Sequence, residues 1–201
     1  MKAQDKMMYR LADALTELMQ TKEFSKITVT EIARKCNLTR QIFYRYFKDK
    51  NDLIGLVYIK EFEKHICMKD TFVWEDSILR MINYLYSERI FYQPLGLADN
   101  DDMLYKILYN QALMIYRNII EYKTKALISH ELEFLLELYC RGGIDLLVNW
   151  IGTGMEIPCE ELKDLFLEGM PDPIKKLLTG DPVPVKYVLG KRQLTLDKRN
   201  G

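Results

Sequence analysis

The chain has 201 residues, of which 48% are hydrophobic and 29% are charged, and its formal net charge is zero. This composition is ordinary for a folded soluble protein, and the length suffices for one compact domain or two small ones. No apolar run approaches the ~20 residues of a membrane span, and the amino-terminal segment does not have the pattern of a signal peptide. The four cysteines have no short-range pairing pattern, so we expect a reduced, cytoplasmic compartment and no membrane partner.

The charges are distributed unevenly along the chain. Residues 1–50 carry 11 Lys and Arg against 6 Asp and Glu, residues 51–180 carry 13 against 21, and residues 181–201 carry 5 against 2. A basic amino-terminal part on an acidic body fits a protein that presents one end to a polyanion, although the excess of charge is modest.

A first helix is predicted over about residues 2–21, where Met and Leu residues recur at helical spacing. Beyond it, Thr28 stands three residues before Glu31. This spacing is that of a capping box, in which the hydroxyl and the carboxylate each accept a hydrogen bond from a backbone N–H group at the start of a helix. The pair therefore predicts a short helix from about Val29 to Cys36.

A second short helix is predicted from Arg40 to about Phe47. Residues 37–38 leave room only for a tight turn before it, and Thr39 can cap its first turn. At helical spacing this helix has one largely apolar side and one cationic side that contains no acidic residue. The cationic side consists of Arg40, Gln41, Tyr44, Arg45 and Lys48.

Two short helices joined by a turn are the arrangement of a helix-turn-helix, whose second helix enters the major groove of DNA. The groove offers base acceptors flanked by phosphates, which suits a face made of hydrogen-bond donors. The alternative is that the face is only solvated, because helix pairs of this kind occur in many proteins that never touch DNA. The geometry alone leaves both interpretations open.

Two strings carry a resemblance to a known family. They are Ile-Ala-Arg-Lys-Cys-Asn-Leu-Thr at residues 32–39 and Ile-Phe-Tyr-Arg-Tyr-Phe-Lys-Asp-Lys-Asn-Asp-Leu-Ile at residues 42–54. The second contains a Tyr-x-x-Phe-x-x-Lys pattern, and together they resemble the DNA-binding domain of the tetracycline-repressor (TetR/AcrR) family. The resemblance covers about residues 8–66; over the rest of the chain it is one of architecture.

The resemblance implies phosphate contacts at the start of the first short helix, where Thr28 and Thr30 occupy the matching positions. For Thr28, helix capping alone is the alternative. The resemblance implies the same role for the hydroxyl of Tyr44 and for Lys50. Lys50 also stands beside the N-terminus of the next helix, which is a ready site for an anion such as a DNA phosphate.

Base contacts are expected from Arg40 and Gln41, because an Arg fork on guanine is the commonest specific pair. Lys48 should hold a phosphate, and Arg45 can do either. The whole predicted DNA-binding set is Thr28, Thr30, Thr39, Arg40, Gln41, Tyr44, Arg45, Lys48 and Lys50.

The sequence pattern of residues 51–170 predicts only helices. They are expected over about residues 51–67, 74–92, 103–125, 130–151 and 160–168, the second ended by Pro94 and Gly96 and the third in one or two pieces. Plain core packing is the simpler interpretation of each aromatic or Met residue there, but together they can line a cavity for an amphipathic or aromatic ligand. In the family this region commonly holds an effector pocket. The candidate lining residues are Tyr84, Tyr105, Tyr109, Gln111, Met114, Asn118 and Trp150.

A wide apolar stripe runs along the helix predicted over residues 130–151, with two adjacent glycines in its middle. Gly inside a helix costs ~1 kcal/mol and is tolerated where something must approach the backbone closely. We expect this helix and the next to form a two-fold dimer interface; a kinked core helix is the alternative. The predicted interface residues are Leu135, Tyr139, Gly142, Gly143, Leu146, Leu147, Leu162 and Phe166.

Two strings near the end of this region carry a second, looser resemblance. They are Arg-Gly-Gly-Ile-Asp-Leu-Leu-Val-Asn-Trp-Ile at residues 141–151 and Glu-Glu-Leu-Lys-Asp-Leu-Phe at residues 160–166. They look like the C-terminal region of the subfamily that includes the dihydroxyacetone-kinase operon regulator.

No constellation for catalysis or for a metal ion is present in the sequence. The two histidines are isolated, and there is no Cys-x-x-Cys, no phosphate-cradling glycine loop and no nucleophile elbow. We therefore expect no enzyme activity, no catalytic residues, no metal site and no cofactor.

We expect an all-α protein in three parts. Residues 1–50 form a three-helix helix-turn-helix DNA-binding domain, extended to about residue 66 by the start of the next helix; residues 51–170 form a larger helical ligand-binding and dimerisation domain; residues 171–201 form a Pro- and Gly-containing basic tail. The predicted function is that of a ligand-responsive transcriptional regulator, expected to be a repressor, which acts as a homodimer on a palindromic operator. Its partners are operator DNA, a second copy of itself and an unknown small-molecule effector. The alternative is a helical dimeric sensor or co-regulator that binds a small molecule or a protein but not DNA.

Overall fold

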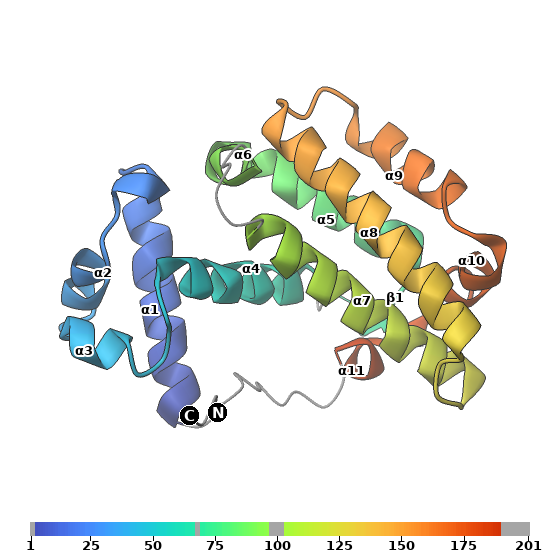
Figure 1. Cartoon of the computed structure of the whole chain (residues 1–201), viewed down its shortest axis with the longest axis horizontal. Coiled ribbons are helices and arrows are strands. Elements are labelled where there is room, and N and C mark those ends of the chain that lie inside the picture. Colours follow the sequence, from blue (N-terminus) through green and yellow to red (C-terminus); the bar gives the residue numbers. More distant parts are fainter. Residues whose placement is uncertain (1–2, 67–68, 97–102, 190–201) are drawn as a thin grey trace. The chain divides into compact units, whose positions relative to one another are not determined.

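The computed structural model describes residues 3–66, 69–96 and 103–189 (Figure 1). The chain divides into two compact units, Met1–Glu63 and Lys64–Gly201, so that the division falls within a helix. The fold is all-α, as predicted, and the described residues contain one small antiparallel sheet of two short strands. None of the described helices is long and apolar enough to cross a membrane.

The first unit is built from short helices on a longer one. In chain order it contains α1 (Ala3–Met19), the 3-10 turn η1 (Phe24–Lys26), α2 (Val29–Lys35), α3 (Arg40–Phe43) and most of α4 (Lys50–Ile66). α2 packs against both α1 and α3 (Figure 1). The core that joins them includes the fully buried side chains of Leu11, Leu15, Ile32, Phe43 and Leu53.

Local capping signals fix where α2 and α3 begin. The Glu31 N–H donates to Thr28 Oγ1 at 3.2 Å and the Thr28 N–H donates to Glu31 Oε2 at 2.8 Å, which confirms the predicted capping box. In the turn, Asn37 has φ 56, a left-handed conformation that Asn adopts more readily than most residues. Thr39 then caps α3, accepting a hydrogen bond from the Ile42 N–H at 3.4 Å.

α3 is shorter than predicted, because its hydrogen-bond pattern becomes mixed after Phe43, although the Phe47 N–H still donates to the Phe43 carbonyl at 3.1 Å. The Arg45 N–H donates to the Ile42 carbonyl at 3.2 Å and the Tyr46 N–H to the Phe43 carbonyl at 2.9 Å, so that residues 44–46 form turns. Both bonds join residues three apart, as in a 3-10 helix. Asp49 then starts α4, its Oδ1 accepting from the N–H groups of Asn51 and Asp52 at 2.8 and 2.9 Å.

The second unit packs its helices around α7 and α8. Its elements are β1 (Thr71–Phe72), α5 (Trp74–Ser87), α6 (Arg89–Gly96), α7 (Met103–Thr124), α8 (His130–Gly152), α9 (Cys159–Glu168), α10 (Asp172–Leu178), β2 (Val183–Pro184) and α11 (Val185–Val188). α8 packs against α6 and α7, α9 against α5, and α10 and α11 against α7 (Figure 1). β1 pairs with β2 in the register Thr71 to Pro184 and Phe72 to Val183.

The region from Trp74 to Gly96 contains two helices where one was predicted. α5 ends at Ser87, Glu88 forms the break, and α6 follows at once. Pro94, predicted to stop the helix, lies inside α6, which ends at Gly96. At that end α6 approaches α8 so closely that a Cβ on Gly96 would lie 2.9 Å from the backbone nitrogen of Gly152. α7 forms one continuous helix.

Part of the predicted tail belongs to the core of the second unit. Ile174, Leu178, Val183 and Val188 are almost fully buried. The amide of Asn118 on α7 donates to the Val188 carbonyl at 2.9 Å and so holds α11 in place. The basic residues of the predicted tail at 191–192 and 198–199 lie outside the described residues.

Candidate nucleic-acid interface

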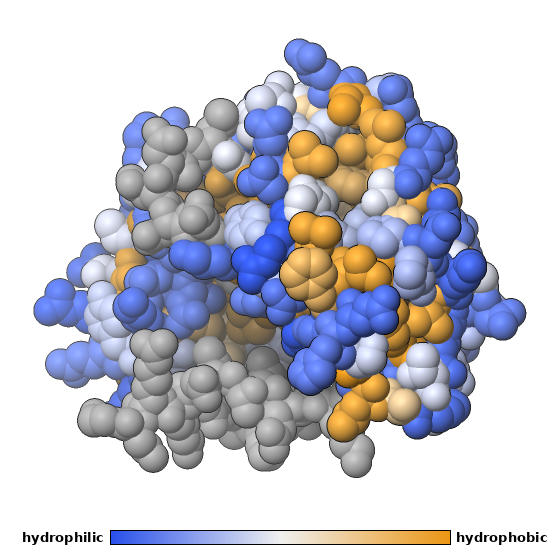
Figure 2. Space-filling model, turned by 45° about the vertical axis from the view of Figure 1, so that its right-hand side comes forward, coloured by the Kyte–Doolittle hydropathy of each residue, from blue (hydrophilic) through white to orange (hydrophobic). Residues whose placement is uncertain are grey.

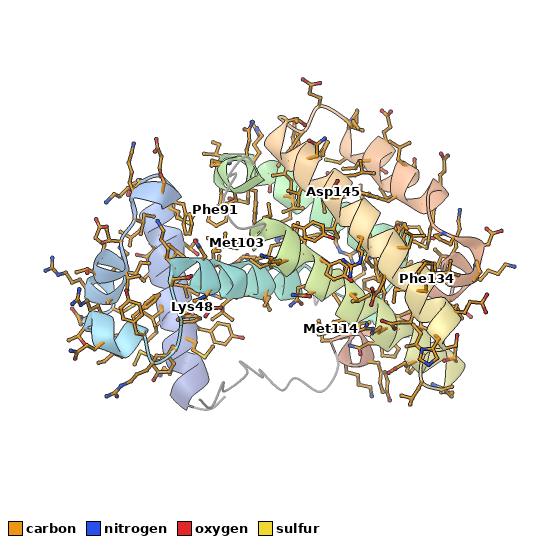
Figure 3. The ribbon with its side chains drawn as sticks, in the orientation of Figure 1. Lys48, Phe91, Met103, Met114, Phe134 and Asp145 are labelled. Atoms are coloured by element: carbon orange, nitrogen blue, oxygen red, sulfur yellow. The ribbon has the colours of Figure 1, made fainter. Side chains whose placement is uncertain are left out.

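The cationic face predicted for α3 is exposed, and its apolar side is buried. Phe43 and Phe47 are 0% and 3% exposed, whereas Tyr44 between them is 55% exposed. Figure 3 shows Lys48 in the turn that leads from α3 to α4. Eight of the nine predicted DNA-binding residues are exposed: Thr28, Thr30, Thr39, Arg40, Gln41, Tyr44, Arg45 and Lys48. The buried rings thus fix the orientation of α3 and leave its donors directed away from the core.

Thr28 has a structural role at the start of α2. Its hydroxyl donates to Glu31 Oε2 at 2.8 Å and accepts from the Glu31 backbone, so that the capping box uses both functions of the group. Lys22 Nζ donates to the other carboxylate oxygen of Glu31 at 2.6 Å. This bond, with the two from Thr28, lowers the pKa of Glu31 to about 2. Glu31 therefore keeps its charge at neutral pH and completes the cap.

Lys50, the ninth predicted residue, is half-buried and bonded inside its own unit. Its ammonium donates to the backbone carbonyls of Phe24, Ser25 and Ile27 at 2.7, 3.0 and 3.0 Å. It also lies 4.6 Å from the centre of the Phe24 ring. Burial, with a smaller effect of Lys22, lowers the pKa of Lys50. No local sequence signal indicates these bonds, because the carbonyls lie more than twenty residues away along the chain.

The predicted ligand-pocket residues lie in different surroundings within the second unit. The hydroxyls of Tyr84 and Tyr92 are 3.1 Å apart, and the Tyr84 ring packs 4.3 Å from the imidazole of His65. Tyr105 and Tyr109 on α7 stack in parallel, 5.8 Å between centres.

The side chains of two other predicted pocket residues donate hydrogen bonds to backbone carbonyls of the second unit. Asn118 holds α11, and the indole N–H of Trp150 donates to the Ile157 carbonyl at 3.0 Å. Gln111 and Met114 are half-buried on α7. Among the residues that the structure describes, no three His, Cys, Asp or Glu side chains are grouped to hold a metal ion.

The predicted dimer-interface residues divide into an inner and an outer set. Leu147 and Leu162 are 8% and 4% exposed, in the core of their own unit. Tyr139 donates its hydroxyl proton to the Phe166 carbonyl at 2.9 Å, and the Phe166 ring packs on Gly143. The outer set consists of Leu146, which is 62% exposed, and Gly142, which is also exposed. Leu135 is half-buried and lies between the two sets in exposure.

Two further exposed apolar residues of α8 were not among those predicted from the sequence. Phe134 and Leu138 are 68% and 58% exposed and stand eight and four residues before Gly142. With Leu146 they form a line at four-residue intervals, here called the α8 ridge: Phe134, Leu138, Gly142 and Leu146. Figure 3 labels Phe134 and Asp145 along α8, and Figure 2 shows hydrophobic residues exposed on the face of the molecule that it draws. The regular spacing of large apolar residues was the available signal.

Comparisons with known proteins agree with this geometry. The profile of the bacterial regulatory proteins of the tetR family matches residues 11–57, and that of a transcriptional regulator C-terminal region matches residues 73–171. The HTH-type dhaKLM operon transcriptional activator DhaS of Lactococcus lactis subsp. lactis is 27% identical over 112 residues, which are 50% of this chain and 60% of that protein. The match thus spans less than two thirds of the relative.

Two solved structures resemble the chain. The dihydroxyacetone kinase operon activator DhaS has a TM-score of 0.55 at 21% identity, covering 86% of this chain and 98% of that one. The fatty acid degradation regulator FadR from Bacillus halodurans has a TM-score of 0.44 at 17% identity, covering 90% and 96%. The first likeness supports the fold.

The exposed helix α3 contains no acidic residue and follows a tight turn, and the chain continues into a region that matches the C-terminal region of transcriptional regulators. With the match to the tetR profile, these features define a helix-turn-helix DNA-binding regulator of transcription. The chain belongs to the tetR family of bacterial regulatory proteins, as its sequence suggested. The matching families and the relative are transcriptional regulators, not enzymes.

Proposed function

We propose that the chain regulates transcription as a homodimer that places α3 of each protomer in successive major grooves of a palindromic operator. The observation that carries this proposal is the exposed cationic side of α3, set against the buried rings of Phe43 and Phe47. Half-sites one helical turn apart then follow from the two-fold symmetry of the dimer.

Arg40 and Gln41 are proposed to read bases, because both are exposed in the first turn of α3, where a recognition helix reaches base edges. Phosphate contacts are proposed for Tyr44, Lys48 and Thr30. Either a base or a phosphate contact is proposed for Arg45 and Thr39. Thr28 is proposed to act mainly as the cap of α2, which orients the neighbouring N–H groups toward a phosphate.

The α8 ridge is proposed to bind a second copy of the chain. A Cβ added at Gly142 would meet nothing within 4 Å among the described residues, so their packing does not explain a glycine in the middle of a long helix. Leu138 and Leu146 stand four residues on either side of it and are both exposed. If α8 crosses its two-fold copy at Gly142, Leu138 faces the partner subunit's Leu146, and the backbones approach closely.

A small-molecule effector is proposed to bind in the second unit, among the half-buried residues Tyr84, Tyr105, Tyr109, Gln111 and Met114. By linkage, an effector that prefers one spacing of the two α3 helices changes operator affinity.

The sequence led us to expect repression, whereas the relative DhaS is described as an activator. Transcription of the neighbouring operon in a deletion strain tests the direction: it rises when a repressor is lost and falls when an activator is lost.

The test of DNA binding starts with genomic fragments selected by the purified protein. On the selected operator, Arg40→Ala should weaken binding by roughly 1–3 kcal/mol and relax the preference at one base position. Lys48→Ala, the control, should weaken binding to all sequences alike. If Arg40→Ala and the wild type share the same sequence preference, Arg40 does not read a base. If no DNA pool shows salt-dependent binding, the sensor that binds no DNA is the better description.

A further inference from the structure

We infer that Lys50 is a positioning residue, which holds the start of α2 against the start of α4 and does not itself contact DNA. The inference rests on the proposed operator binding, because it assigns to Lys50 a role within that interface. It departs from the sequence-based expectation that Lys50 binds a phosphate.

The Lys50 ammonium uses its full hydrogen-bonding capacity within the fold. A lysine ammonium has three donors, and Lys50 Nζ lies within 3.0 Å of three backbone oxygens, those of Phe24, Ser25 and Ile27. A phosphate could capture this group only by taking it from carbonyl groups that belong to a part-buried turn. Leaving a partly buried carbonyl without a hydrogen-bond donor lowers the stability of the fold. The arrangement in which Lys50 binds the three carbonyls is therefore favoured over one in which it binds a phosphate.

The position of Lys50 on α4 also indicates a structural role. A cation in the first turn of a helix faces the positive end of the helix dipole, which is unfavourable. The ammonium instead reaches the carbonyls at the end of η1, and the face of the Phe24 ring lies 4.6 Å away. Lys50 therefore connects the start of one helix to the end of the turn that precedes another.

The clamp acts on the residues that present α2 to DNA. The Ile27 carbonyl that Lys50 holds belongs to the residue directly before Thr28, the cap of α2, and the Ile27 side chain is 1% exposed. Thr30, in the first turn of α2, is exposed. α3 packs against α2, so the start of α2 that Lys50 holds belongs to the same packed group of helices as the donors of α3.

Lys48 provides a matched comparison two residues away. It is exposed, and its backbone N–H is bound by Asp52 at 3.0 Å, so that the turn is fixed while the side chain extends from it. The two lysines thus have the same charge but different surroundings, one solvated and one clamped.

The experiment measures operator affinity of the full-length protein at several salt concentrations. For Lys48→Met, the slope of log K against log salt should shrink by about 0.9 for each phosphate that the variant no longer neutralises. For Lys50→Met we expect affinity to fall by about tenfold with the slope unchanged. Lys50→Arg should not restore affinity, because a planar guanidinium cannot direct its donors to three carbonyls around one point. Circular dichroism confirms that each variant is folded at the temperature used.

A double-mutant cycle separates positioning from general destabilisation. Thr30→Val removes a hydroxyl from the start of α2, and its effect on affinity should be smaller in the Lys50→Met background than in the wild type. The effect of Arg40→Ala should change less. A loss of stability alone would leave both effects additive.

Two results overturn the inference. One is a slope for Lys50→Met reduced as much as that for Lys48→Met, with Lys50→Arg retaining wild-type affinity. The other is unchanged hydrogen-exchange protection of the amides of residues 27–32 in Lys50→Met without DNA. The exchange measurement needs no operator, so the inference stays testable if the wild type shows no salt-dependent binding, which would refute the proposed function instead.

Discussion

At the scale of single residues, the charge of Glu31 illustrates how strongly a surface group can depend on its neighbours. The hydrogen bond from Lys22 contributes most to the lowered pKa of about 2, followed by the bonds from the backbone and hydroxyl of Thr28. Because the carboxyl is more acidic in the folded chain than its ordinary value of 4.5, its ionisation favours folding. That contribution is complete above pH 4.5 and disappears as the pH falls toward 2.

Replacing Glu31 by Gln should therefore lower the stability of the first unit at pH 7. Gln can still accept a hydrogen bond but carries no charge for Lys22. The difference in unfolding free energy between the wild type and Glu31→Gln should shrink as the pH falls from 4.5 to about 2, where the wild-type carboxyl takes up its proton. Urea unfolding of both proteins at a series of pH values measures this difference in unfolding free energy. A difference that stays constant over this range would contradict the assigned pKa.

Gly96 is a residue whose role only the structure reveals. A Cβ there would lie 2.9 Å from the Gly152 nitrogen and 3.1 Å from the Val148 carbonyl oxygen, and neither backbone atom can rotate away. Gly96→Ala should lower the unfolding free energy by about 1–3 kcal/mol through overpacking of α6 on α8. Thermal unfolding measures the loss.

Gly169→Ala is the matched control for this substitution. Gly169 is exposed with φ −73, and its added Cβ would meet its nearest neighbour, the Leu165 carbonyl oxygen, at 3.4 Å. The stability of this variant should stay within about 0.5 kcal/mol of the wild type. Equal losses in the two variants would show that the close approach of α6 and α8 is not the cause.

At the scale of elements, the sequence predicted where helices start better than where they end. The starts of α2 and α3 follow from threonines that bond to backbone groups three residues away, which a sequence displays directly. The end of α3 depends on a change of hydrogen-bond pattern behind Phe43, and Phe43 is placed by packing. The break at Glu88 has no strong local signal. Ends that tertiary contacts decide cannot be read from local spacing.

The last described helix shows how a distant contact can order a segment that its composition describes as a tail. Pro and Gly residues near 180–184 give this segment the composition of a tail, yet the short helix α11 forms beside β2, and Asn118 donates a hydrogen bond to its Val188 carbonyl. Asn118→Ala should release this carbonyl and lower stability by about 1 kcal/mol. Hydrogen exchange of residues 185–189 should rise at the same time.

Asn110→Ala tests whether the effect belongs to the hydrogen bond. Asn110 lies on the same helix, α7, but is exposed. Both substitutions raise helix propensity by a similar amount, so the difference between the two variants isolates the contact with α11. Unchanged exchange in Asn118→Ala would show that the packing of Val188 suffices without the amide.

At the scale of the whole molecule, periodicity located helix α8 but did not show which of its sides is buried within the chain. The apolar stripe of α8 was correctly placed, yet its inner residues such as Leu147 pack within the chain, and the exposed Phe134 and Leu138 were not predicted. A leucine that is buried in the core of its own chain has the same hydrophobicity as a leucine that is exposed and binds a partner. Only the packing of α6 and α7 against one side of α8 distinguishes them. The same limit applies to Lys50, whose partners are set by the fold.

The proposed dimer predicts a selective effect on the α8 ridge. Leu138→Glu places a charge in the ridge, where the side chain is 58% exposed, so the fold of the single chain should be retained while the dimer dissociates. Leu127→Glu is the control, because Leu127 is 87% exposed in the loop before α8 and outside the ridge. Sedimentation equilibrium should show a monomer for the first variant and a dimer for the second. A dimer in both would place the interface elsewhere.

Gly142→Ala provides a sharper test, because folding and association should respond in opposite directions. Among the residues that the structure describes, the new methyl group meets nothing within 4 Å, and alanine is about 1 kcal/mol better than glycine inside a helix. At dilutions where the protein is monomeric, unfolding free energy should therefore rise. If two α8 helices cross at this residue, the same methyl group separates their backbones and weakens the dimer, and operator affinity falls with it because two α3 helices must bind together. A variant that is both more stable as a monomer and unchanged as a dimer would exclude a crossing at Gly142, since no described residue of the same chain opposes the substitution.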